Sequence, residues 1–173
     1  MSPPPPSHLV RIGGTSKPEL LRQLGEAGVQ LNAHALTLFA DTRFTPAAAG
    51  STVEIIQVSV ASLGFAEGAT YSALVERARL AGWFEGPLEL GPHLRLALLD
   101  QPEGAIGRSA EQGRAPPGAI TIASPSLDEE DEFPKGFYLR RIEGTLWLRG
   151  YRSWSGHIWG PDDSFAFVAR SVA

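Results

Sequence analysis

The clearest hydrophobic pattern of the chain lies on either side of Glu143-Gly144, where two runs of strand-forming residues meet. Gly144 can adopt a left-handed conformation without steric cost, so this pair is typical of the two-residue turn of a β-hairpin. With that turn, Leu139 lies opposite Leu148, and the hydrophobic side chains share one face. We expect this face to be buried; it comprises Phe137, Leu139, Leu146 and Leu148.

The opposite face of the same hairpin alternates aromatic and basic side chains. We call it the hairpin face, and its members are Tyr138, Arg140, Trp147, Arg149 and Tyr151. Arg140 is predicted to lie opposite Trp147, which places Trp147 between two guanidinium groups. Such groups favour cation–π contacts and base stacking, and Arg, Trp and Tyr are also frequent anchors of protein interfaces. The hairpin face is therefore the candidate binding site. The competing interpretation is that a helix covers it, with the arginines extending past the rings to solvent.

Three short amphipathic helices are predicted in the first half of the chain. Their expected N-caps are Ser16, which forms a capping box with Glu19, then Asn32, and then Thr70. In the second helix we expect Leu36, Phe39 and Ala40 to face inward. The third helix ends at Gly82, and its predicted buried side consists of Tyr71, Leu74, Val75, Ala78 and Ala81.

Strands are predicted mainly in the second half. An earlier strand runs from Val53 to Val60, and its hydrophobic positions change face around Gln57, as a bulge or burial on both sides would produce. Further strands are expected at residues 93–99, 120–123 and 165–168. Residues 1–14 are rich in proline, so we expect a disordered tail ahead of a single domain at residues 15–173.

Early helices followed by hairpin-linked strands indicate an α+β fold with a mainly antiparallel sheet. In this fold the C-terminal β-hairpin packs against the amphipathic helix that begins after Thr70. A short helix pair lies near the N-terminus. The composition agrees with one globular domain, since the 173 residues are 43% hydrophobic and 20% charged.

Charge and cysteine content exclude several classes of protein. A net charge of -4 argues against a protein that coats duplex nucleic acid through bulk positive charge, although a local basic patch is still allowed. The chain has no cysteine, which excludes disulfides, thiolate nucleophiles and cysteine-ligated metals. We find neither a signal peptide nor an apolar run long enough to span a bilayer, so we expect a cytoplasmic protein without membrane contacts.

Motifs of nucleotide-driven or hydrolytic chemistry are missing from the sequence. There is no Gly-x4-Gly-Lys-Ser/Thr phosphate loop, no Gly-x-Ser-x-Gly elbow and no His-Glu-x-x-His zinc motif. We therefore predict no cofactor and no ATP turnover. The histidines lack metal-ligand spacing, which predicts no metal site; they are His8, His34, His93 and His157. Asp162 and Asp163 could pair as acid and base, but turn chemistry explains their position equally well.

An unbroken acidic run, residues 128–132, comes just before a stretch that is strongly basic. Between residues 133 and 152 the chain carries one acidic residue and five basic ones, namely Lys135, Arg140, Arg141, Arg149 and Arg152. The acidic run either docks on these arginines or is displaced by a polyanionic or acidic partner. Residues 101–118 form the longest predicted loop, and loops of this length inside a domain are often functional.

Several segments resemble a group of small bacterial proteins of uncharacterised function, some of which carry an automatic "helicase" label. These segments are residues 28–32, 38–44, 88–96 and, as the longest, 134–142 with its continuation at 147–152. The resemblance extends over about residues 15–168 and implies no particular activity, fold or site. Because a helicase motor needs an ATP-phosphate cradle, we expect no helicase activity.

Three functions fit these observations. The first is a non-catalytic binding module, such as an immunity, antitoxin or adaptor protein, that uses the hairpin face on a protein partner. The second is a nucleic-acid-binding protein that uses the same face. The third is a small hydrolase whose site gathers His93 or His157 with Asp100, Asp162 or Asp163. The sequence contains no signal for a particular oligomeric state.

Overall fold

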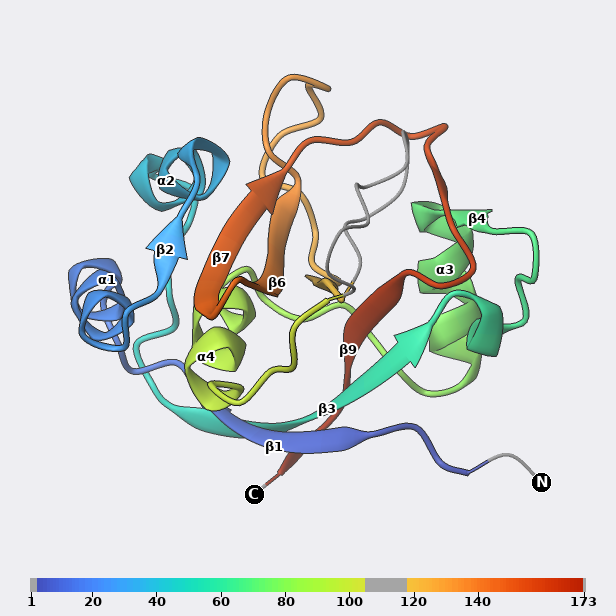
Figure 1. Cartoon of the computed structure of the whole chain (residues 1–173), viewed down its shortest axis with the longest axis horizontal. Coiled ribbons are helices and arrows are strands. Elements are labelled where there is room, and N and C mark those ends of the chain that lie inside the picture. Colours follow the sequence, from blue (N-terminus) through green and yellow to red (C-terminus); the bar gives the residue numbers. More distant parts are fainter. Residues whose placement is uncertain (1–2, 105–117, 173) are drawn as a thin grey trace.

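The computed structural model describes residues 3–104 and 118–172, and it confirms the predicted α+β fold (Figure 1). A seven-stranded, mostly antiparallel sheet forms the centre. Its strands, in order across the sheet, are β1 (Ser7–Ile12), β3 (Ser51–Ser59), β9 (Ser164–Val172), β5 (Ile120–Ile122), β6 (Gly136–Ile142), β7 (Thr145–Tyr151) and β2 (Gln30–Leu31). Only the β5–β9 and β2–β7 pairs are parallel. A separate pair consists of β4 (Ala69–Thr70) and β8 (Ile158–Trp159).

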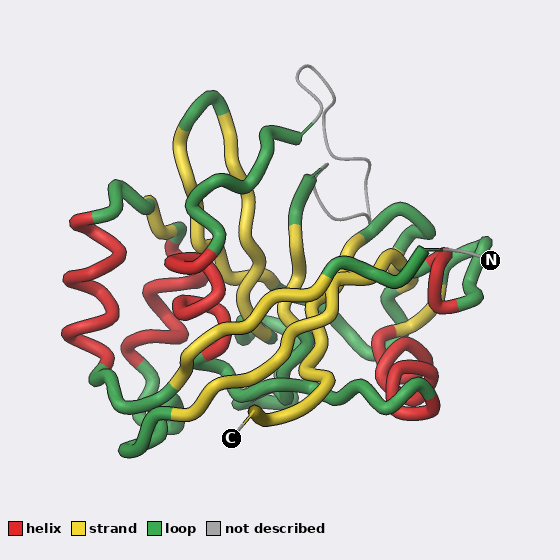
Figure 2. Tube along the Cα trace, turned by 90° about the horizontal axis from the view of Figure 1, so that it is seen from below, coloured by secondary structure: helices red, strands yellow, loops and turns green. Residues whose placement is uncertain are grey.

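The helices pack on both faces of the sheet and lie in two groups. Three of them gather at one end of the molecule, namely α1 (Lys17–Glu26), α2 (Ala33–Ala40) and α4 (Leu90–Ala97) (Figures 1 and 2). The other, α3 (Tyr71–Leu80), lies at the far end with the short 3-10 helix Ala61–Leu63. Each group has its own hydrophobic core. Ile55 of β3 faces the core of α1, α2 and α4, whereas its neighbour Ile56 faces the core of α3.

The predicted hairpin is confirmed in turn and register. Leu139 pairs with Leu148 and Arg140 with Trp147. Glu143 and Gly144 both have positive φ, at 48° and 80°, as the two central residues of this turn require. The buried face is also as predicted for Phe137, Leu139 and Leu148, which have no exposed surface, while Leu146 is half-buried against the same core.

Helix α2 is fixed tightly to the hairpin through its N-cap. The side chain of Asn32 accepts hydrogen bonds from the backbone N–H groups of Ala35 and Gly150, and its amide group donates to the carbonyl of Gly150. A Cβ atom at Gly150 would lie 2.7 Å from the backbone carbon of His34, so only glycine allows this approach without a shift. This contact brings the helix directly onto β7.

The expected N-caps are correct, whereas the predicted inward side of α2 is correct only for Phe39. Ser16, Asn32 and Thr70 each accept the predicted capping bond from the residue three positions on. The buried residues of α2 are Ala35, Leu38 and Phe39, whereas Leu36 is 51% exposed and Ala40 is also exposed. Because Asn32 binds Gly150, the helix faces β7 with positions 35, 38 and 39, and Leu36 lies about 100° away from Ala35 around the axis.

The strand predicted at residues 93–99 is wrong, since this region belongs to α4. The alternation of His93-Leu94-Arg95-Leu96 suggested a strand. Leu90 and Leu94, however, are four residues apart and both are buried, which is the spacing of one helix face. Pro92 does not prevent the helix, because it lies in the first turn, where its missing N–H has no helical partner to lose.

The expected disordered tail is corrected as well, because residues 7–12 form strand β1 at the edge of the sheet. Val10 and Ile12 lie two positions apart on this strand, and both are buried in the core. Strand β1 pairs antiparallel with β3. That burial of hydrophobic surface stabilises the segment despite the preceding prolines.

Strand β3 confirms the predicted burial on both sides, although its register shift against β9 falls between Glu54 and Ile55 rather than around Gln57. The loop predicted at residues 101–118 lies largely outside the described residues. Within the described parts of the chain, no helix has the length and apolar character needed to cross a bilayer.

Candidate functional site

The hairpin face lies on the same side of the sheet as α3, but α3 covers only part of that side. The buried residues of α3, Leu74 and Ala78, pack in a core with β3 and β9, and of the hairpin face only Tyr151 contacts this core. Trp147 belongs to neither hydrophobic core. The competing interpretation, in which this helix buries Trp147, is therefore wrong for that residue.

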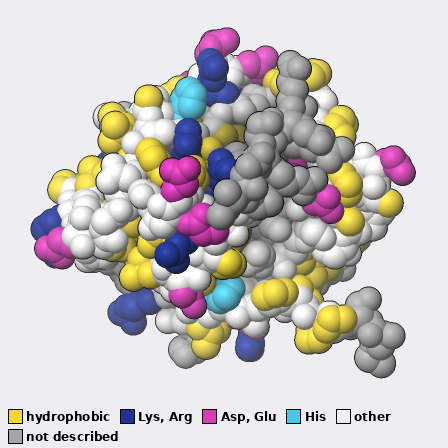
Figure 3. All heavy atoms as spheres, in the orientation of Figure 1, with side chains coloured by type: hydrophobic (Ala, Val, Ile, Leu, Met, Phe, Trp, Pro, Cys, Tyr) yellow, Lys and Arg dark blue, Asp and Glu magenta, His cyan; other side chains and the backbone are white. Residues whose placement is uncertain are grey.

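All five members of the hairpin face are half-buried, and Arg149 is the arginine whose guanidinium contacts rings of this face. The guanidinium of Arg149 lies 5.0 Å from the centroid of the Trp147 ring and 6.0 Å from that of Tyr138. The rings of Tyr138 and Tyr151 are 6.5 Å apart. Burial raises the pKa of the Tyr138 hydroxyl, which keeps this ring neutral. On the side of the molecule drawn in Figure 3, basic and acidic side chains are interspersed.

The two arginines of the hairpin face have no anionic partner among residues 3–104 and 118–172. Within the described part of the chain, no carboxylate lies within 4.0 Å of the guanidinium of Arg140 or Arg149. The Nε atoms of both side chains are buried and make no hydrogen bond. A buried donor on a charged group that lacks an acceptor costs free energy.

A fully buried arginine supports the hairpin from the opposite side of the sheet. Arg95 of α4 has no exposed surface and donates hydrogen bonds to Gln101 Oε1 at 2.6 Å, to the Leu98 carbonyl at 2.5 Å and to the Trp147 carbonyl at 3.2 Å. Its longer contact, 3.5 Å, is with the carbonyl of Arg140. Desolvation and the nearby charge of Arg141 lower the pKa of Arg95 to about 10. Arg95 therefore holds the backbone of the two opposed residues at the centre of the hairpin face.

This role of Arg95 could not be predicted from the sequence, since arginine is rarely buried without a paired carboxylate. A carboxylate fixes the turn in a similar way. Glu103 accepts hydrogen bonds from the backbone N–H groups of Glu143, at 3.2 Å, and Gly144. It also lies 3.9 Å from Arg141. Arg95 and Glu103 thus position the hairpin backbone, which leaves the side chains of the hairpin face to interact elsewhere.

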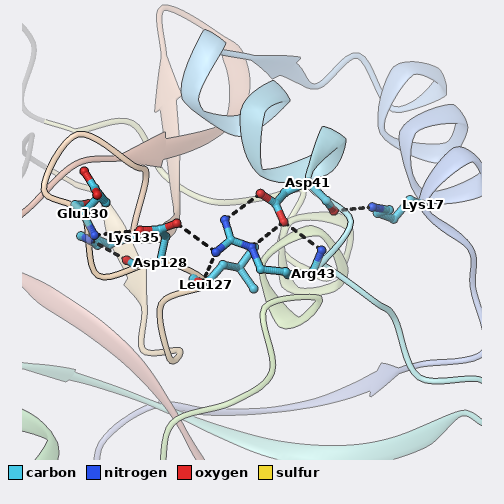
Figure 4. Close-up of polar contacts among 7 residues, drawn as sticks. All are labelled: Lys17, Asp41, Arg43, Leu127, Asp128, Glu130 and Lys135. Carbon is cyan, nitrogen blue, oxygen red and sulfur yellow. Dashed lines mark hydrogen bonds and ion pairs between the residues drawn. The ribbon is translucent and has the colours of Figure 1, made fainter.

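The acidic run at residues 128–132 docks on basic side chains, but not on those of the hairpin face (Figure 4). Asp128 pairs with Arg43 at 2.9 Å, and the ammonium of Lys135 donates to the carbonyls of Asp128 and Glu130. Glu132 pairs with Arg152 at 2.8 Å. The docking prediction, which concerned the arginines, thus holds for Arg152, while Arg140, Arg141 and Arg149 form no ion pair with the acidic run in the described part of the chain.

Arg43 connects the acidic run to the end of α2. It binds Asp41 as well as Asp128, and the ammonium of Lys17 donates to the carbonyl of Asp41 (Figure 4). Hydrogen bonds from Arg43 lower the pKa of Asp41 to about 2. The pKa of Asp128 is lowered first by the backbone N–H of Glu130 and then by Arg43. Asp41 is therefore ionised at neutral pH and keeps this connection in place.

The histidines do not assemble the predicted hydrolase site around Asp100 or Asp162, both of which are exposed. His93 instead lies 3.9 Å from Glu89, and its Nε2 atom accepts a hydrogen bond from the N–H of Gly13. Burial raises the pKa of Glu89 and lowers that of His93.

His157, the other histidine considered for that site, packs edge-on against the ring of Trp159 at 4.9 Å. Burial lowers the pKa of His157, while the carboxylate of Asp163 acts in the opposite direction. Asp163 accepts a hydrogen bond from the N–H of Gly160, as its predicted place in a turn implies. Residues 3–104 and 118–172 contain no group of three or more His, Asp or Glu side chains arranged to hold a metal ion.

The sequence matches no protein-family model, and neither a curated protein nor a solved structure matches it significantly. The resemblance to the small bacterial group thus stays a prediction, and function has to be argued from the site.

Proposed function

We propose that this protein is a non-catalytic binding module whose hairpin face holds an acidic segment of a partner protein. The observation that carries the proposal is the pair of half-buried guanidinium groups, Arg140 and Arg149, to which the described residues offer no carboxylate partner. Carboxylates accompany other arginines of this chain, as in the pairs of Arg22 with Glu19, Arg152 with Glu132 and Arg170 with Glu54. An acidic partner would supply the acceptors that Arg140 and Arg149 lack.

Trp147 supports the same proposal as the central anchor. It is half-buried, it is in cation–π contact with Arg149, and its backbone is held by Arg95. Tryptophan and arginine dominate the binding energy of protein interfaces when a rigid scaffold presents them together. An acidic segment with an apolar side chain would engage both the arginines and the indole.

The test compares two polyanions, one that mimics an acidic protein segment and one that is a nucleic acid. A labelled oligoglutamate peptide and a labelled oligothymidylate of equal charge are titrated with the protein, and binding is followed by fluorescence anisotropy at several salt concentrations. We expect the peptide to bind and the double variant Arg140→Gln/Arg149→Gln to abolish its binding. Arg79→Gln, on the exposed side of α3, is the matched control and should bind as the natural chain does.

The outcome for the oligothymidylate decides between the two candidate partners. Stronger binding of the nucleic acid, with a steep linear dependence of log affinity on log salt, would replace the acidic-protein proposal with the nucleic-acid alternative. If neither polyanion binds, or if the double variant binds as tightly as the natural chain, the arginines do not recognise an anion and the proposal is wrong.

A further inference from the structure

A pocket of about 280 Å³ lies beside the C-terminal end of β7 and is separate from the arginines of the hairpin face. Four aromatic side chains from distant parts of the sequence line it: Tyr71, Tyr151, Trp154 and Trp159. They come from the start of α3, the end of β7, the segment after β7 and strand β8. The volume is just below the range of about 300–1,000 Å³ that is usual for small-molecule sites, so a compact ligand would fit.

The aromatic lining is well ordered on its inner side. Trp159 is only 5% exposed and packs edge-on against Tyr151, with ring centroids 5.6 Å apart. The hydroxyl of Tyr71 donates to Glu85 at 2.7 Å, which fixes this ring and places a carboxylate behind it. Trp154, at 59% exposure, lies on the solvent side of the pocket. A ligand would thus meet preformed aromatic walls.

The charge around the pocket is negative. Glu129 and Asp131 line it, and neither has an ion pair or hydrogen bond to its side chain within the described residues. Lys135 also lines it, but its ammonium already donates to the carbonyls of Asp128 and Glu130. Aromatic faces attract cations, and unpaired carboxylates at the rim strengthen that attraction.

We propose that this pocket binds a small organic ammonium cation. The aromatic rings would surround the cation, and Glu129 and Asp131 would balance its charge. This inference is independent of the proposed function, because the charge it requires is opposite to that bound by Arg140 and Arg149.

Choline is a suitable probe, and 3,3-dimethyl-1-butanol is its neutral analogue of nearly the same shape. Both are titrated into the full chain by isothermal calorimetry at constant ionic strength. We expect choline to bind about tenfold or more tightly than the neutral analogue, as partly desolvated cation–π contacts would give. Trp154→Ala and the double variant Glu129→Gln/Asp131→Asn should each weaken choline binding several-fold.

Two control variants make the result specific. Glu76→Gln, an exposed carboxylate on α3, should leave choline binding unchanged, and so should Arg140→Gln/Arg149→Gln, which tests the proposed function instead. Equal affinity for choline and its neutral analogue, or no choline binding in the millimolar range, would overturn the inference. If Trp154→Ala fails to fold, Glu129→Gln/Asp131→Asn tests the inference in its place, since both carboxylates are exposed. Unchanged choline binding by that double variant would also overturn the inference.

Discussion

The buried cation beneath the hairpin offers the sharpest test of the structure, through the substitution Arg95→Met. Methionine has a similar length and can occupy the same space, so the change removes hydrogen bonds without leaving a large cavity. Three of the acceptors of Arg95 lie within 3.2 Å, on Gln101, Leu98 and Trp147. All of them would lose their donor in the interior of the protein.

The expected loss follows from two opposing terms. Each hydrogen bond from a charged group contributes about 1.5–3 kcal/mol, so three such bonds contribute roughly 5–9 kcal/mol. Removing the buried cation also stabilises the protein by several kcal/mol, because the desolvation cost of that charge disappears. We therefore expect Arg95→Met to lower the free energy of unfolding by about 3–5 kcal/mol, a large part of the roughly 5–15 kcal/mol of a typical domain.

Urea unfolding followed by circular dichroism measures this loss. Arg79→Met, at an exposed position of α3, is the matched control and should change stability by less than about 0.5 kcal/mol. If Arg95→Met does not fold, Gln101→Leu removes one acceptor and should cost about 1–3 kcal/mol. A loss below about 1 kcal/mol for Arg95→Met, in a variant with an unchanged spectrum, would refute the account of Arg95 as the support of the hairpin.

Three further predictions concern the core, the hairpin face and a buried carboxylate. Leu148→Ala should cost about 2–5 kcal/mol in urea unfolding, because Leu148 is fully buried opposite Leu139; a loss below about 0.5 kcal/mol would contradict that packing. Trp147→Ala should weaken partner binding by about 2 kcal/mol or more while costing less stability than Leu148→Ala, and the reverse order would make Trp147 a core residue. Glu89→Gln should stabilise the protein at pH 8, because burial raises the folded-state pKa of Glu89 and its ionisation costs stability as pH rises above the unfolded value near 4.5. That gain should disappear below about pH 4, where Glu89 is protonated in both states, and a gain independent of pH would disprove the linkage.

Local signals allowed the hairpin and the helix starts to be predicted from the sequence. The turn at Glu143-Gly144 fixes the register, and the register fixes which side chains share a face. The five residues of the hairpin face could be named for this reason. Capping likewise depends on residues only three positions apart, as at Ser16 and Glu19.

The remaining features depend on contacts between residues far apart in the sequence. Hydrophobic and polar side chains alternate in residues 93–99 as they would in a strand. Only the burial of both Leu90 and Leu94 against the sheet shows that this region is helical. Strand β1 forms because β3, more than forty positions later, offers an edge. Nothing near Arg95 signals that it is buried, since its acceptor on Trp147 is 52 positions away. The pocket could not be predicted for the same reason, because its aromatic walls come from α3, β7, the segment after β7 and β8.

The position of β9 in the sheet has a consequence for how the protein is made. Strand β9 lies between β3 and β5, yet it is the last strand of the chain. During synthesis, at roughly 5–20 residues per second, the β1–β3 pair and the β5–β6–β7 unit both leave the ribosome before the strand that joins them. Until then β3 and β5 each present an open edge with unpaired backbone groups. The nascent chain therefore passes through a stage with two unconnected half-sheets, and this is the stage at which it is most exposed to aggregation.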